Sequence, residues 1–257
     1  MKGHWDGVGD LLNSLNSATA EESMVVNEVI RRLEEIADPH IVERRSQRSG
    51  IVAKNALGVD QKQLKVIARE IGLDNALAIS LFETDIYEAR LLCSKIFEPG
   101  DLSEALMEYW ATSFDNWEIC DSFCMGFFAK SPHARKKALE WSGREEQFVK
   151  RAGFSIMAAY GFAHKDAENA VFEAFLERIE RESSDERHYV KKAVNWALRS
   201  VGKRNSDLNI AASRIADQLQ RSPSKAARWV GSNALRELED PGRTMYDYPR
   251  AQYRVDS

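Results

Sequence analysis

Proline, glycine and cysteine are scarce in this chain of 257 residues, and each shortage excludes a class of protein. Six prolines and fourteen glycines are too few for a β-sandwich, which needs a turn roughly every ten residues. The cysteines Cys93, Cys120 and Cys124 form an odd set in apolar helical stretches. We therefore expect buried thiols of a reducing compartment, in preference to disulfides or metal ligands.

Long apolar runs and the common catalytic signatures are also missing. No apolar run approaches the roughly 18 residues that a membrane span needs, and the N-terminus lacks the apolar core of a signal peptide. The five histidines are scattered without metal-ligand spacing, and there is no G-x-S-x-G, no P-loop and no G-x-G-x-x-G after a strand. We expect a cytoplasmic protein that contacts no membrane and holds neither metal nor cofactor.

Acidic and basic residues are unevenly distributed along the chain. Residues 1–125 carry 12 Lys or Arg and 22 Asp or Glu, whereas residues 126–257 carry 24 and 18. The stretch 187–206 holds six basic residues and no acid, and 130–137 holds four more, again without an acid. A charge run is usually a solvated face, but two runs on corresponding parts of neighbouring helical hairpins favour a surface that binds a polyanion.

Helical periodicity recurs along the chain with short gaps, and no stretch has the pattern of a strand. Apolar spacing predicts a helix over 21–37, followed by a more basic helix over 40–53. Aspartates stand at the expected N-caps of the next helices: Asp60, Asp74, Asp85, Asp101 and Asp115. Longer helices are predicted over 144–160, 165–182, 186–203, 207–220 and 223–238. The segment 241–257 has two prolines and no period, so we expect a loose, irregular tail.

Five blocks resemble one another and indicate an internal repeat. They are YEARLLCSKIF (87–97), NWEICDSFCMGFF (116–128), FVKRAGFSIMAAY (148–160), YVKKAVNWALRSV (189–201) and AARWVGSNAL (226–235). With Arg90, Asp121, Arg151, Lys192 and Arg228 as equivalents, the steps are 31, 30, 41 and 36 residues, close to the roughly 30–47 residues of two-helix repeats. The sequence therefore predicts an all-α, HEAT-like helical-repeat solenoid over 1–240, a single domain in which one helix per pair lines a concave face.

One group of side chains on the expected lining helices can carry chemistry. Trp117 and Asp121 are four residues apart, so they share a helix face. Arg151 has the corresponding place on the next lining helix, and Trp196 lies on the one after it. Each has a plain alternative: core packing for the tryptophans, an ion pair for Asp121 and a solvated charge for Arg151. Their recurrence at equivalent positions favours a ligand site on the concave face.

The same blocks resemble those of the AlkD-type DNA alkylation-repair proteins, the HEAT-like repeat DNA glycosylases. The likeness runs from about residue 50 to about residue 235. Its most specific pieces are the W-x-x-x-D of Trp117 and Asp121, the K-R-A of Lys150 to Ala152, and the K-A-x-x-W-A-L-R of Lys192 to Arg199. The resemblance implies a protein that grips duplex DNA and excises alkylated purines as free bases.

The resemblance also implies a role for each site residue. Trp117 and Trp196 would flank the deoxyribose of the lesion. Asp121 would lie at the anomeric carbon, and Arg151 would lie near the adjacent phosphates. The other cations of the lining helices would bind DNA phosphates: Lys150, Lys191, Lys192, Arg199, Lys203 and Arg204. Because an N3-alkyladenine or N7-alkylguanine is already cationic and leaves readily, a carboxylate that stabilises the oxocarbenium-like sugar suffices.

We therefore expect a monofunctional DNA-alkylpurine N-glycosylase, a hydrolase that acts on double-stranded DNA as a monomer and is associated with the nucleoid. The alternative is a non-catalytic HEAT-like module that binds DNA structure or a protein partner, because helical repeats are mostly binding scaffolds. An RNA-directed binder is a third alternative. Asp121 with both tryptophans favours the enzyme, because a pure DNA binder has no need of an acid in a phosphate groove.

Overall fold

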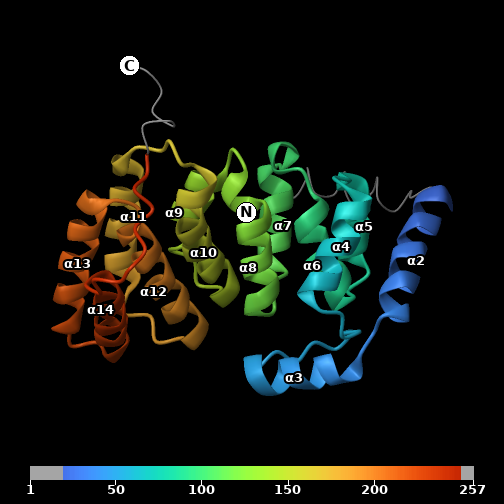
Figure 1. The fold of residues 1–257 in the computed structure, drawn as a ribbon, viewed down its shortest axis with the longest axis horizontal. Coiled ribbons are helices and arrows are strands. Elements are labelled where there is room, and N and C mark those ends of the chain that lie inside the picture. The colour runs from blue at the N-terminus through green and yellow to red at the C-terminus, as the bar shows by residue number, and fades with distance from the viewer. Residues whose placement is uncertain (1–19, 250–257) are drawn as a thin grey trace. The chain divides into compact units, whose positions relative to one another are not determined.

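Residues 20–249 are described by the structure, a computed structural model of the chain, and every regular element in that range is helical (Figure 1). The all-α prediction is therefore confirmed for those residues. The chain divides into two compact units, Met1–Tyr109 and Trp110–Ser257, and the single domain over 1–240 stays a prediction. The N-terminal stretch examined for a signal peptide and the end of the predicted tail lie outside the described residues.

The first unit contains helices α2 to α6 and most of α7. Their bounds are α2 (Ala20–Glu35), α3 (Pro39–Ser49), α4 (Gln61–Ile71), α5 (Asn75–Glu83), α6 (Tyr87–Ile96) and α7 (Glu104–Thr112), with a short 3-10 turn at Pro99–Asp101. In α4 the buried residues Leu64, Ile67 and Ala68 recur at helical spacing. One face of this helix therefore packs inward while its charged face meets solvent.

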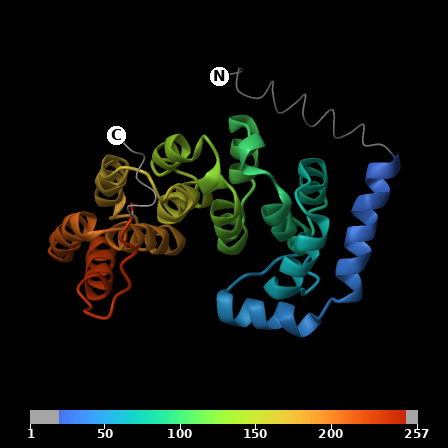
Figure 2. The ribbon, with the colours of Figure 1, turned by 45° about the horizontal axis from the view of Figure 1, so that its top comes forward.

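The second unit is a double layer of helices. Their bounds are α8 (Trp117–Gly126), α9 (Ala134–Trp141), α10 (Gln147–Ala163), α11 (Asn169–Glu182), α12 (His188–Gly202), α13 (Ser206–Gln220) and α14 (Lys225–Leu238), with a 3-10 turn at Phe128–Lys130. Helix α10 packs between α8 and α12, and α12 packs on α14, whereas α9, α11 and α13 form the second layer (Figure 2). We call α8, α10, α12 and α14 the lining helices.

Two of the predicted aspartate caps are confirmed. Asp60 accepts hydrogen bonds from the backbone N–H groups of Lys62 and Gln63, at 2.7 and 2.9 Å, at the start of α4. Asp74 accepts one from the N–H of Leu77 at 2.9 Å, at the start of α5. Both side chains satisfy backbone donors that have no partner within the helix.

The other three predicted caps are wrong. Asp85 has a φ of 55°, and Ile86 precedes α6 without any capping side chain. Asp115 is displaced by its neighbour Asn116, whose side chain accepts hydrogen bonds from two N–H groups of the first turn of α8. Asp101 belongs to the 3-10 turn, and the hydroxyl of Ser103 accepts from the first turn of α7 at 3.2 Å instead.

The part of the C-terminal segment that the structure describes is docked, which corrects the expectation of a loose tail. The N–H groups of Tyr246 and Tyr248 each donate to a backbone carbonyl at the end of α12, of Lys203 and Arg204 respectively, both at 2.9 Å. The ring of Tyr246 also meets the ring of Phe162, with centroids 4.7 Å apart. These contacts fix the segment on unit 2 although it forms no helix.

A buried carboxylate organises the loop before α4 in unit 1. Glu88 is fully buried and accepts hydrogen bonds from the N–H groups of Leu57 and Gly58, at 2.8 and 3.0 Å, and from Arg45 at 2.9 Å. Gly58 has a φ of +88°, and a Cβ at this position would lie 2.0 Å from the carbonyl oxygen of Asp38. Only glycine fits this close approach.

We predict that Gly58→Ala destabilises unit 1 far more than Gly72→Ala. Both glycines have a positive φ, but a Cβ on Gly72 would meet nothing within 4 Å. Gly72→Ala therefore costs only the backbone strain, about 1–2 kcal/mol, whereas Gly58→Ala adds a backbone clash. The free energy of unfolding in urea measures both. Equal losses would show that the loop moves freely away from Asp38.

Candidate functional site

Three of the predicted site residues, Asp121, Arg151 and Lys192, lie at matching positions near the start of their lining helices. The thiol of Cys120 in α8 donates to the carbonyl of Phe148 in α10 at 3.6 Å, and Asn195 in α12 donates to the carbonyl of Val230 in α14 at 3.1 Å. Two further contacts, from Cys124 to the carbonyl of Ala152 and from Lys203 to Glu237, advance in the same direction along both helices, so α8 runs parallel to α10 and α12 runs parallel to α14. Their fifth residues form what we call the fifth-residue row: Asp121, Arg151, Lys192 and Trp229.

The centre of this row is a two-pronged ion pair. Arg151 donates from Nε to Oδ1 of Asp121 at 2.9 Å and from Nη2 to Oδ2 at 2.6 Å. The hydroxyl of Ser155, one turn further along α10, donates to the same Oδ1 at 2.9 Å. The remaining guanidinium nitrogen, Nη1, donates to the backbone carbonyl of Tyr189 in α12 at 2.6 Å. One arginine thus connects three lining helices.

The ion pair is nearly removed from water. The side chain of Arg151 is 7 % exposed and that of Asp121 is 17 % exposed. Burial lowers the pKa of Arg151, but the adjacent Asp121 carboxylate raises it more, so the net shift is upward. Arg151 is therefore charged at any physiological pH, and the small exposed part of Asp121 is the only acidic surface in the fifth-residue row.

The two predicted site tryptophans lie on either side of the ion pair along the helices and are partly exposed. Trp117 is the first residue of α8, one turn before Asp121, and Trp196 lies on α12 one turn after Lys192. In contrast, Trp110 and Trp141 are fully buried in the core of unit 2. Trp117 and Trp196 thus keep surface that a ligand can contact, whereas a tryptophan that only packs in the core is fully buried.

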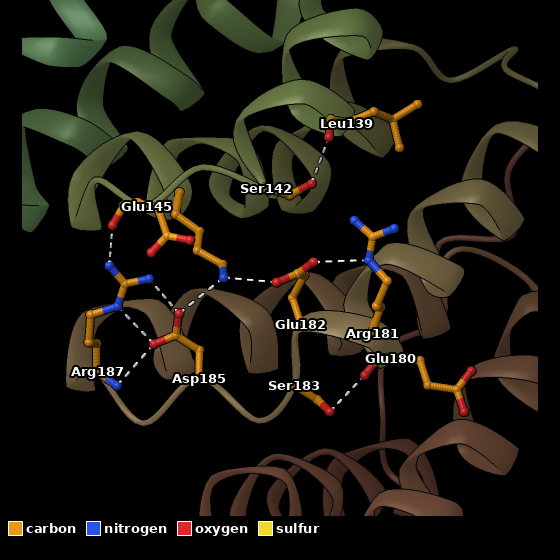
Figure 3. Close-up of polar contacts among 10 residues, drawn as sticks. Leu139, Ser142, Glu145, Glu180, Arg181, Glu182, Ser183, Asp185 and Arg187 are labelled. Carbon is orange, nitrogen blue, oxygen red and sulfur yellow. Dashed lines mark hydrogen bonds and ion pairs between the residues drawn. The ribbon is translucent and has the colours of Figure 1, made fainter.

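Lys150 is not a surface residue. Its side chain is 10 % exposed, and its Nζ lies 2.8 Å from Glu182 and 3.1 Å from Asp185. Figure 3 shows these two carboxylates between α11 and α12, with Arg181 and Arg187 as their further partners. The network fixes the loop that leads into α12, so Lys150 has a structural role that the prediction of phosphate binding did not anticipate.

Arg204 is buried as well, which makes its predicted contact with phosphate wrong. It is 1 % exposed, and its guanidinium stacks on Phe172 with 4.1 Å to the ring centroid. It donates to the carbonyl of Gly161 at 3.1 Å and to three more carbonyls in the following loop, of His164, Lys165 and Ala167. Burial lowers the pKa of Arg204. This arginine fixes the end of α10 and the loop that follows it, and it leaves no surface for a phosphate.

The remaining predicted cations are accessible to different degrees. Lys192 is exposed, while Lys191 lies over the ring of Trp229. Arg199 and Lys203 both pair with Glu237 of α14. Burial raises the pKa of Glu237, but the hydrogen bonds from the two cations lower it by more. Arg199 and Lys203 can therefore reach a phosphate only by giving up this carboxylate.

Sequence reasoning missed three members of the site. Ser155 lies four residues after Arg151, a spacing that places both on one helix face and was a usable signal. Trp229 directly follows Arg228 in the last repeat block, and the repeat alignment matched Arg228, not Trp229, with Asp121, Arg151 and Lys192. Tyr189 takes part through its backbone carbonyl, for which a sequence carries no signal.

The described residues contain no group of His, Cys, Asp or Glu that could hold a metal ion. Cys93, Cys120 and Cys124 are buried free thiols, as predicted. Burial raises the pKa of Cys93 and of Cys124 well above the usual value of a thiol.

In residues 20–249 no helix is both long enough and apolar enough to cross a membrane.

Comparisons with known proteins identify the family and the fold. A family model described as DNA alkylation repair enzyme matches residues 29–238, and no curated protein matches the sequence. Among solved structures, the chain is similar to a protein from a new family related to the HEAT-like repeat DNA glycosylases with affinity for branched DNA structures. The TM-score is 0.65 and the identity 21 %, over 82 % of this chain and 94 % of that chain. A designed armadillo repeat protein gives a TM-score of 0.40 at 14 % identity, over 89 % and 98 %. The match at a TM-score of 0.65 confirms the HEAT-like fold.

We predict that Asp121→Asn lowers the free energy of unfolding by about 3–5 kcal/mol, because it leaves the buried charge of Arg151 without its partner. The matched control is Asp217→Asn on α13, where an exposed aspartate pairs with Arg221 at 2.7 Å. That exposed pair contributes less than about 1 kcal/mol. Thermal or urea unfolding compares the two variants, and similar losses would mean that Arg151 has access to water.

Proposed function

The chain belongs to the DNA alkylation repair enzyme family, and on that premise we propose that it is an N-glycosylase that releases cationic alkylpurines from duplex DNA. The observation that carries the proposal is the fixed carboxylate of Asp121, partly exposed between two partly exposed tryptophans. Its substrates are N3-alkyladenine and N7-alkylguanine, and water completes the hydrolysis of the glycosidic bond.

Asp121 acts in this proposal by electrostatics and by positioning water. The alkylated base is already positive, so it leaves without a general acid and positive charge develops on the deoxyribose. A carboxylate whose orientation is set before the reaction stabilises that charge without having to reorganise. Arg151 and Ser155 provide this orientation with three hydrogen bonds. Arg151 also weakens the field of the carboxylate, which is the cost of holding it in place.

Trp117 and Trp196 supply aromatic faces for the cationic sugar or base. A cation over an indole face gains about 0.5–2 kcal/mol, with the larger values where water is excluded. Both rings are partly exposed and lie within about one helical turn of the fifth-residue row. Lys192 is exposed one turn before Trp196 on α12, and it binds a DNA phosphate in this proposal.

The second candidate is a non-catalytic module that binds DNA structure. One observation favours it: the Asp121 carboxylate is mostly buried and already accepts three hydrogen bonds, as a purely structural ion pair would. A protein with a similar fold belongs to a family with affinity for branched DNA structures. This candidate keeps the DNA contacts of the lining helices and removes the excision step.

The decisive measurement is release of free base from methylated duplex DNA in single turnover. Asp121→Asn should slow release by about 100-fold or more, equivalent to roughly 2.7 kcal/mol of transition-state stabilisation. Asp217→Asn should leave the rate unchanged, since its pair with Arg221 lies on the second layer. Circular dichroism at the assay temperature shows whether the folded fraction of Asp121→Asn accounts for the loss.

Two further variants test the aromatic contacts of the site. Trp117→Ala and Trp196→Ala should lower both the rate and the DNA affinity, because they remove contact surface together with cation stabilisation. Duplex DNA containing uracil should yield no free base, since a neutral base needs an acid that this site lacks. If the wild-type chain binds methylated DNA and releases no base, the non-catalytic module replaces the enzyme.

We predict that Lys192→Gln makes the plot of log affinity against log salt less steep, with a slope smaller in magnitude by about 0.9. This is the value for one lost phosphate contact. Lys203→Gln should flatten the plot by less, because Lys203 must first leave Glu237. Arg214→Gln on α13 is the control, an exposed cation of the second layer. An equal change for Arg214 would mean that DNA does not select the lining helices.

A further inference from the structure

Trp229 is an exposed tryptophan that the proposed excision reaction does not use. It is 38 % exposed and ends the fifth-residue row on α14. The ammonium of Lys191 on α12 lies 5.1 Å from the centre of its ring. A cation at this distance is attracted to an aromatic face. The contact orients the indole and keeps the charge of Lys191 at the surface beside it.

The surroundings of Trp229 are basic. The sequence from Gln218 to Arg236, which includes most of α14, contains no acid, and neither does the stretch 187–206, which includes α12. Lys192, Lys225 and Arg228 are exposed near it on the same two helices. We call these residues the Trp229 patch: Lys191, Lys192, Lys225, Arg228 and Trp229.

The patch is also held in place. Nη1 of Arg228 donates to the backbone carbonyls of Ser222 and Pro223, both at 2.8 Å, so it anchors the loop that precedes α14. Val230, next to Trp229, is fully buried, and its carbonyl accepts a hydrogen bond from Asn195. The indole therefore stands on a rigid turn, which reduces the entropy lost when a ligand binds.

An apolar ring among cations fits a ligand that combines an aromatic face with negative charge. Nucleic acid has both, but in a duplex the face of each base is covered by its neighbours. Only an unpaired nucleotide offers a face to an aromatic side chain. We propose that Trp229 is a stacking platform for an unpaired nucleotide of a DNA strand whose phosphates contact Lys192 and Lys225. This rests on the DNA-binding part of the proposed function and not on base excision.

The position of Trp229 in the row tells where the unpaired nucleotide lies. Three helix spacings of roughly 8–10 Å separate α8 from α14, or roughly 24–30 Å in all. This is the length of roughly seven to nine stacked base pairs at 3.4 Å each. A DNA strand that crosses the lining helices from Asp121 thus becomes single-stranded at the patch about that many nucleotides from the alkylated purine.

The test compares two unmethylated DNA duplexes with the full chain, one blunt and one with a short single-stranded tail at its 3′ or 5′ end. Fluorescence anisotropy gives both affinities. Trp229→Ala should weaken binding of the tailed duplex by about five-fold or more, as expected for one lost base stack. Binding of the blunt duplex should change less than about two-fold. Trp229→Phe should restore most of the preference, because it keeps an aromatic face.

Phe162→Ala is the matched control, since Phe162 is 47 % exposed on α10 and packs on Tyr246 of the C-terminal segment. It should leave both affinities unchanged. An equal loss for blunt and tailed duplexes in Trp229→Ala, or no loss for the tailed one, overturns the proposal. Tail-dependent binding without base release contradicts the proposed excision reaction and leaves the stacking platform standing. Base release without a preference for the tailed duplex contradicts the stacking platform and leaves the excision reaction standing.

Discussion

The ion pair between Asp121 and Arg151 is the interaction on which the arrangement of the site depends. Its two hydrogen bonds join α8 to α10, and the same guanidinium reaches the carbonyl of Tyr189 at the start of α12. Because both charges are largely buried, neither can be removed without leaving the other uncompensated. The parallel register of the lining helices therefore has an electrostatic component in addition to the packing of their apolar faces.

The same pair limits what the site can do chemically. The Asp121 carboxylate accepts two hydrogen bonds from Arg151 and one from Ser155, so it has little freedom to turn toward a leaving base. It is better suited to stabilising positive charge that develops nearby, since its orientation is fixed before the reaction. This restricts the proposed reaction to bases that leave without the help of an acid. Cationic alkylpurines satisfy this condition, and neutral lesions do not.

The helical hairpins and their order could be predicted from sequence because each helix buries one apolar face at a regular spacing. Local signals were less reliable. Asp60 and Asp74 cap helices as predicted, but Asn116 replaces Asp115, since both residue types cap well and only the backbone geometry decides between them. The repeat alignment did bring Asp121 and Arg151 to equivalent depths on adjacent helices.

The roles of individual cations could not be predicted, because burial of a charge depends on partners that are distant in sequence. Arg204 ends an acid-free run that indicates phosphate binding, yet its partners are carbonyls about forty residues earlier in the chain, from Gly161 to Ala167. Lys150 and Arg151 are adjacent in sequence, but they pair with carboxylates on opposite sides, Asp185 after α11 and Asp121 on α8.

Under the proposed function, this division of the cations bears on how a chain with a net charge of −4 holds DNA. Glu237 accepts from both Arg199 and Lys203, and thereby keeps two long side chains in one orientation before any phosphate arrives. A phosphate that displaces this carboxylate finds ordered partners, so less side-chain entropy is lost on binding. The exchange replaces one anion by another, however, so the gain in binding free energy is smaller than at a cation without an acidic partner. Under the proposed function, affinity therefore depends more on exposed cations such as Lys192 than on the paired ones, which act mainly in selecting where the DNA backbone lies.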